Sequence, residues 1–106
     1  MSENIMTLEV GKRYGIPDLG RGYEVSYVGE SKVPPGHVDV AYHCPKMGLI
    51  SSVSDTSSIP IDGSGMKSLS GNQLVPNNQS VEFRVGSISA DKRKLELIVK
   101  VKDRVA

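Results

Sequence analysis

The sequence predicts one small all-β domain, built as an antiparallel barrel or sandwich with at most one short helical turn. Three observations predict it: apolar residues recur at every second position in several short segments, glycine and proline separate these segments, and no long segment has helical periodicity. A chain of 106 residues is long enough for one hydrophobic core and too short for two. We therefore predict a single β domain that spans residues 1–106.

The first half of the chain contains a strand, a glycine-rich loop and a hairpin. Alternation begins at Met6–Val10, and three glycines and a proline then mark residues 15–22 as a loop. Two further alternating segments, Tyr23–Tyr27 and Val38–His43, are expected to pair as antiparallel strands. This order is similar to the opening of an SH3-like barrel, a resemblance of topology that implies no particular function.

The end of the chain predicts a second hairpin. Apolar residues alternate with polar ones in Val81–Val85, and again in Leu95–Lys102. Residues 90–93 form a polar turn between them, short enough for the two strands to pair in antiparallel fashion.

Residues 44–80 have a weaker pattern. Leu49, Ile50 and Val53 suggest a short strand, and Pro60, between two isoleucines, suggests an edge strand or an extended segment. The segment around 62–80 is rich in Gly, Ser and Asn, so we expect a long ordered loop. One helical turn at Met66–Leu69 is the alternative there.

The sequence contains no signal that indicates secretion or membrane insertion. The first ten residues do not read as a secretory signal, and no segment approaches the roughly 20 apolar residues of a membrane span. Cys44 is the only cysteine, which excludes an internal disulfide and fits a reducing compartment. We therefore expect a cytoplasmic protein without a membrane partner, whose compactness and lack of a catalytic constellation suit an accessory protein of a phage or mobile element.

One triplet resembles a catalytic motif. Asp55, Thr56 and Ser57 resemble the catalytic loop of aspartic proteases, in which each of two chains supplies a carboxylate. The flanking residues depart from that family, because three serines dilute the preceding strand and the last strand lacks a glycine. A turn stabilised by side-chain hydrogen bonds is the interpretation we prefer. No enzyme is predicted, and the dimeric protease ranks third.

Metal and phosphate sites are not indicated. His43 and Cys44 are adjacent, so in a strand they point to opposite faces and cannot share one ligand set. We expect a buried Cys44 beside an exposed His43, and neither a metal nor a cofactor. The segment Asp62–Gly65 lacks the Gly-Lys-Ser/Thr that a phosphate-binding loop requires, and we expect a flexible turn.

The last hairpin carries an excess of positive charge, although the whole chain has a net charge of only +1. Four basic residues could contact phosphates from this hairpin: Arg93, Lys94, Lys100 and Lys102. Weak nucleic-acid binding is therefore the alternative function. The other interpretation is a solvated face whose lysines discourage edge-to-edge aggregation.

The leading hypothesis is a non-enzymatic binding module whose partner is a protein, a small ligand or a second copy of the chain. Interfaces favour tyrosine and arginine, and four such residues lie around the first loop and hairpin: Tyr14, Arg21, Tyr23 and Tyr27. Small β domains also leave sheet edges that pair in symmetric dimers, so a homodimer is expected. The competing interpretation is that all four tyrosines of the chain, these three and Tyr42, are half-buried and complete a core that is poor in Phe and Trp.

Overall fold

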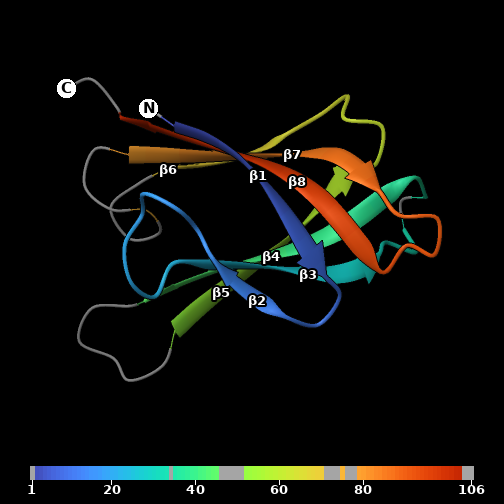
Figure 1. The fold of residues 1–106 in the computed structure, drawn as a ribbon, viewed down its shortest axis with the longest axis horizontal. Helices are drawn as coiled ribbons and strands as arrows, with labels where there is room; N and C mark the ends of the chain where they lie inside the picture. The colour runs from blue at the N-terminus through green and yellow to red at the C-terminus, as the bar shows by residue number, and fades with distance from the viewer. Residues whose placement is uncertain (1, 34, 46–51, 71–74, 76–78, 104–106) are drawn as a thin grey trace.

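The computed structural model describes residues 2–33, 35–45, 52–70, 75 and 79–103, and these form a two-layered β-sandwich (Figure 1). All the described secondary structure is strand. The strands are β1 (Ser2–Glu9), β2 (Arg13–Gly15), β3 (Glu24–Glu30), β4 (His37–Pro45), β5 (Ser52–Pro60), β6 (Lys67–Ser70), β7 (Gln79–Ile88) and β8 (Lys94–Asp103).

The strands form two antiparallel sheets of four, which are not closed into a barrel. Sheet A has the order β1-β8-β7-β6, and sheet B has the order β2-β3-β4-β5. The chain starts in sheet A, builds sheet B, and returns to complete sheet A. The all-β prediction is confirmed, and of the two predicted architectures the structure has the open sandwich.

Both predicted hairpins are confirmed by their registers. In β3 and β4, Val25 pairs with Tyr42, so alternate residues of both strands share the inner face. In β7 and β8, Phe83 pairs with Val99, and a bulge shifts the register between Val85 and Ser87. A turn around residues 89–93 joins these two strands, closed by a 2.9 Å hydrogen bond that the Lys92 N–H donates to the Ser89 carbonyl.

The segment predicted as a long loop contains a strand instead. Lys67–Ser70 is β6 rather than a helical turn, because it pairs with β7 and buries Leu69 in the core. Asp55, Thr56 and Ser57 lie within β5, so the predicted turn at this triplet is wrong. Pro60 ends β5, which is an edge strand as expected. Leu49 and Ile50 lie outside the described residues.

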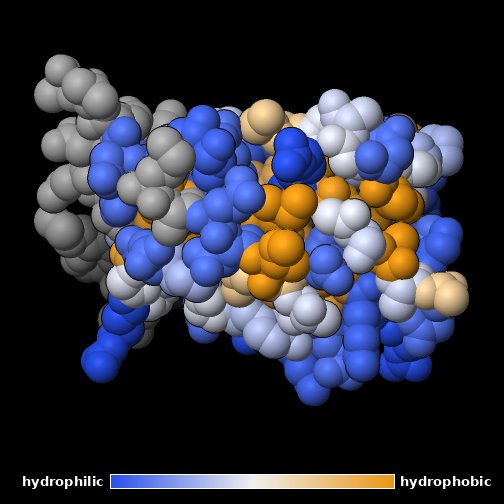
Figure 2. Space-filling model, turned by 45° about the horizontal axis from the view of Figure 1, so that its top comes forward, coloured by the Kyte–Doolittle hydropathy of each residue, from blue (hydrophilic) through white to orange (hydrophobic). Residues whose placement is uncertain are grey.

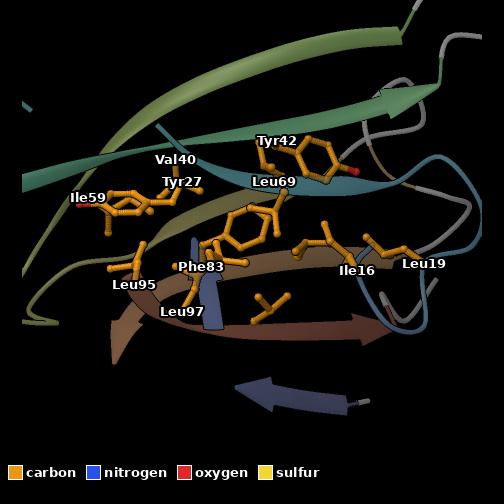
Figure 3. Close-up of a cluster of buried hydrophobic side chains, with 14 of the residues drawn as sticks. Ile16, Leu19, Tyr27, Val40, Tyr42, Ile59, Leu69, Phe83, Leu95 and Leu97 are labelled. Carbon is orange, nitrogen blue, oxygen red and sulfur yellow. The ribbon is translucent and has the colours of Figure 1, made fainter. Parts of the chain in front are cut away.

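The core lies between the sheets and receives side chains from both (Figure 3). Phe83 of sheet A meets Tyr42 of sheet B at a centroid separation of 6.0 Å and a tilt of 49°. Ile16 and Leu19, from the glycine-rich loop, close one end of the core. This loop is therefore a structural part of the sandwich.

Two of the four tyrosines depart from the half-buried state we expected. Tyr27 and Tyr42 are fully buried, whereas Tyr14 and Tyr23 are partly buried against the core. The Tyr27 hydroxyl donates a 2.8 Å hydrogen bond to the Lys92 carbonyl, which satisfies it without water. None of the described segments contains a helix long and apolar enough to cross a membrane.

Candidate functional site

The four residues predicted to bind a partner do not form one exposed surface. Tyr27 has no exposed area, and its hydroxyl is already engaged by the turn before β8. The Tyr14 hydroxyl accepts a 3.1 Å hydrogen bond from the backbone N–H of Glu9, which joins β2 to the end of β1. Tyr23 packs against the core, and only Arg21, in the loop, is exposed. Tyr14 and Tyr27 therefore connect sheet B to sheet A through their hydroxyls, and Tyr23 packs against the core.

The predicted basic stripe is interleaved with acidic side chains. Lys100 and Lys102 lie on the outer face of sheet A, where Lys100 stands between Glu3 of β1 and Glu82 of β7. Lys102 and Glu82 form an ion pair with a nitrogen–oxygen distance of 2.9 Å. The positive charge of β8, seen in the sequence as an excess, is therefore largely balanced by its neighbours in the sheet.

The turn before β8 is balanced in the same way. Lys94 is opposite Glu9 in the β1–β8 register, and Lys92 forms a 3.1 Å ion pair with Glu30. The Asp91 carboxylate accepts hydrogen bonds from the Ser89 hydroxyl and the Arg93 backbone N–H, and these bonds lower the pKa of Asp91. Arg93 is exposed. The structure does not gather the four predicted basic residues into one uncompensated patch.

The outer face of sheet A also presents apolar side chains to solvent. Ile5 is 66% exposed and lies directly opposite Ile98 in the β1–β8 register, and Met66 is 56% exposed. Charged residues of both signs surround them. We call this set the outer patch: Glu3, Ile5, Met66, Glu82, Arg84, Ile98 and Lys100.

The outer patch includes a shallow hollow of about 100 Å³, lined by all of its members except Ile5. In Figure 2 the strands at the top of Figure 1 come forward, and apolar atoms gather in the middle of the visible face among hydrophilic ones. Sequence reasoning missed this surface, since it expected β1 to begin at Met6. The available signal was an isoleucine at an outward position of each of two strands, at 5 and 98.

The outer face of sheet B is different, and its centre is a buried histidine. His43 is only 6% exposed, so the predicted exposed histidine is wrong. Its Nε2 lies 2.9 Å from the Ser26 hydroxyl and its Nδ1 lies 2.7 Å from the Ser54 hydroxyl. These bonds link β3, β4 and β5 through side chains.

The electrostatics of His43 favour the neutral ring. Burial lowers the pKa of His43 below the ordinary 6.5, and the nearby Arg13 guanidinium lowers it further. Cys44 points to the opposite face, as predicted, and burial raises the pKa of its thiol. Within the described ranges, His, Cys, Asp and Glu do not cluster in groups of three that could hold a metal ion.

The protease-like triplet is not arranged as an exposed catalytic loop. Asp55 is paired with Tyr42 in the β4–β5 register, which places it on the inner side of β5. Its carboxylate lies 3.8 Å from the Lys67 ammonium of β6. This ion pair connects the edges of the two sheets, a structural role that the sequence pattern did not indicate.

Comparisons of the chain with models of protein families, with curated proteins and with solved structures found no match. The functional argument therefore depends on the geometry of the surfaces described above.

Proposed function

We propose that the protein is a non-enzymatic interaction module that binds a protein partner through the outer patch of sheet A. One observation carries the proposal: Ile5, Ile98 and Met66 reach solvent on one sheet face, beside a hollow bounded by charges of both signs. Apolar side chains grouped at a surface and rimmed by polar ones are typical of protein interaction sites.

The chemistry of the patch favours a protein over a nucleic acid. A phosphate backbone is bound by uncompensated Lys and Arg side chains. Here Lys100 has a glutamate on each side, and Lys102 is paired with Glu82. Alternating charges of this kind complement a protein surface of similar composition and select against like-charged partners.

The shape of the patch favours a protein over a small ligand. Sites for drug-sized ligands are clefts of about 300–1,000 Å³ that enclose most of the ligand. The hollow at the outer patch is smaller, about 100 Å³, and is open. It is suited to receive one side chain from a flat partner surface.

The test compares matched variants on the two outer faces. Ile98→Glu places a charge in the outer patch, and Val28→Glu places the same charge on the outer face of sheet B, where Val28 is 52% exposed. Each tagged variant is cross-linked in extract of its native cells, with and without nuclease treatment, and the linked proteins are identified by mass spectrometry. We expect one defined protein with wild type and with Val28→Glu, reduced at least about tenfold with Ile98→Glu.

Two outcomes would overturn this proposal. Equal capture by Ile98→Glu and wild type would show that the outer patch is not the binding surface. Retention that disappears on nuclease treatment, and that is also lost in an Arg93→Glu/Lys94→Glu double variant, would show nucleic-acid binding by the β7–β8 turn instead.

A further inference from the structure

We propose that a second copy of this chain pairs with the free edge of β1, in an antiparallel register centred on Ile5. The pairing would join two copies of sheet A into one continuous sheet of eight strands. This inference rests on the proposed function, since it names the protein that meets the Ile5 side of the outer patch.

The orientation of the β1 backbone follows from one hydrogen bond. The Val10 N–H donates to the Arg93 carbonyl at 2.9 Å, so the backbone groups of Val10 point toward β8. Alternate residues of an antiparallel strand point their N–H and C=O groups to opposite sides. Counting back from Val10, the backbone groups of Glu3, Ile5, Thr7 and Glu9 point away from β8, where sheet A has no further strand among the described residues.

At one end of this edge, the outward-facing backbone groups are already hydrogen-bonded within the chain. The Glu9 N–H donates to the Tyr14 hydroxyl at 3.1 Å, and the Glu9 carbonyl accepts a 3.2 Å hydrogen bond from the Lys12 N–H. Glu9 therefore has no backbone group left for another strand. The outward-facing groups that remain belong to Glu3, Ile5 and Thr7, a set that is symmetric about Ile5.

That symmetry selects a register. A two-fold axis perpendicular to the sheet, passing beside Ile5, pairs Ile5 with its own copy and Glu3 with Thr7 of the other copy. This register uses all three sets of outward-facing groups in both chains. A shift of two residues toward Glu9 would place Glu3 opposite the other copy's Glu9, which opposes like charges and needs backbone groups that are already bonded.

The side chains agree with the same register. Ile5 faces outward, 66% exposed, and its neighbour across the β1–β8 ladder is Ile98. Pairing at Ile5 brings the two Ile5 side chains together, so that a continuous row of four isoleucines crosses the joined sheet. On the inner face, Asn4 of each copy comes opposite Met6, which already packs against the core.

The other sheet edges are less suited to pairing. The Ile61 N–H, just after β5, donates to the carbonyl of Gly36, just before β4, so the alternate residues of β5, including Ser58 and Pro60, face its free edge. Pro60 has no N–H to donate, and proline at an edge discourages pairing. The edge strands β2 and β6 have only three and four residues. Among the side chains that the structure describes on the two long edge strands, the exposed apolar one is Ile5 of β1.

The first measurement is the molar mass of the purified chain over a concentration series, by light scattering and sedimentation. We expect the mass to rise from 11.4 kDa toward twice that value. Thr7→Pro removes an N–H that faces the free edge and leaves the β1–β8 ladder intact, because a proline is tolerated when its N–H side faces solvent. We expect Thr7→Pro and Ile5→Glu to weaken association at least about tenfold, and Val28→Glu to leave it unchanged.

Single cysteines test the register directly. Paired residues of this kind lie about 5.5 Å apart between Cα atoms, within the range that a disulfide spans. We expect Ile5→Cys to form a covalent dimer under mild oxidation. Glu3→Cys alone should not, because its two copies would lie about 13 Å apart, whereas a Glu3→Cys/Thr7→Cys double variant should cross-link. Cys44, the natural cysteine, is buried.

The outcomes separate this inference from the proposed function. A mass of 11.4 kDa at every concentration, or equal cross-linking by Ile5→Cys and Glu3→Cys, would overturn the β1 pairing. Capture of a different protein that depends on Ile98, by a chain that stays monomeric, would support the proposed function while refuting the second copy as its partner. Circular dichroism and thermal unfolding of each variant identify any loss of association that results from misfolding.

Discussion

The outer faces of the two sheets are built on the same alternation of residues, yet their polar side chains find partners in different ways. On sheet B, the Ser26 and Ser54 hydroxyls hold His43, and Asp39 accepts a 2.6 Å hydrogen bond from Ser58. On sheet A, long charged side chains oppose one another across the strands while Ile5 is left in solvent.

The difference follows from side-chain length and shape. Short hydroxyl side chains on neighbouring strands leave room for a histidine ring to lie between them, so the ring is buried and bonded at both nitrogens. Lysine and glutamate side chains extend into solvent and gain little from their pairing. Sheet B therefore satisfies polar groups within its outer face, whereas sheet A keeps Ile5 exposed on its outer face, where we propose that a partner binds.

The largest expected effect concerns what the two sheets share. Phe83→Ala removes a buried ring that meets Tyr42 across the core, and we expect it to lower the free energy of unfolding by about 3–5 kcal/mol. Phe83→Leu, which keeps much of the volume, should cost less than half as much. Urea unfolding followed by circular dichroism measures both. A Phe83→Ala cost under about 1 kcal/mol would show that the sheets do not depend on a common core.

The next effect concerns His43. His43→Ala leaves the buried Ser26 hydroxyl without this partner, and we expect a loss of about 1–3 kcal/mol in urea unfolding. Thr56→Ala, an exposed neighbour on β5, is the matched control and should change stability by less than about 0.5 kcal/mol. Equal effects of the two changes would contradict the structural role of the histidine.

The pH dependence of stability sharpens the same point. Because burial lowers the pKa of His43 in the folded state, the unfolded chain binds a proton more readily as pH falls through 6.5. Stability attributable to His43 is therefore complete above that pH and declines below it, by at most about 1.4 kcal/mol per pH unit. His43→Gln should remove this part of the decline. Urea unfolding at steps of about half a pH unit between pH 7.5 and 5.5 measures this difference. An identical pH profile for His43→Gln and wild type would show that His43 does not cause the decline.

The smallest effect is expected on the charged face of sheet A. Lys102→Ala breaks the ion pair with Glu82, and pairs of this exposure contribute about 0–1 kcal/mol. Addition of salt should reduce even that contribution, because ions screen exposed charges. Thermal unfolding at low and high salt gives both values. A loss above about 2 kcal/mol would show that this ion pair on sheet A contributes as much to stability as the histidine hydrogen bonds on sheet B.

Much of the fold could be predicted because apolar alternation reports directly on which face of a strand is buried. The β3–β4 and β7–β8 hairpins follow from it, and so do the buried positions of β8. β6 escaped prediction because Leu69 is its only apolar residue, beside one lysine and two serines. The tyrosines were placed less well, since a phenol ring with a hydroxyl is compatible with both a core and an interface.

The candidate site was harder to predict than the fold. Lys100 and Lys102 were recognised as an outward-facing stripe, but the glutamates that balance them come from β1 and β7, at sequence positions 3 and 82. Charge counted along the chain cannot show which opposite charges lie beside it in a sheet. The outer patch depends on the same long-range pairing.

By itself, the sequence determined that this chain forms a small antiparallel β domain with two hairpins, because the period of its apolar residues is a local property. Only the tertiary structure decided that the strands form two open sheets, that His43 is buried between two serines, and that Ile5 stands at a free edge beside Ile98. These features arise from strand order and register, which join residues far apart in the chain. The free energy that selects them comes from packing both sheets on one core.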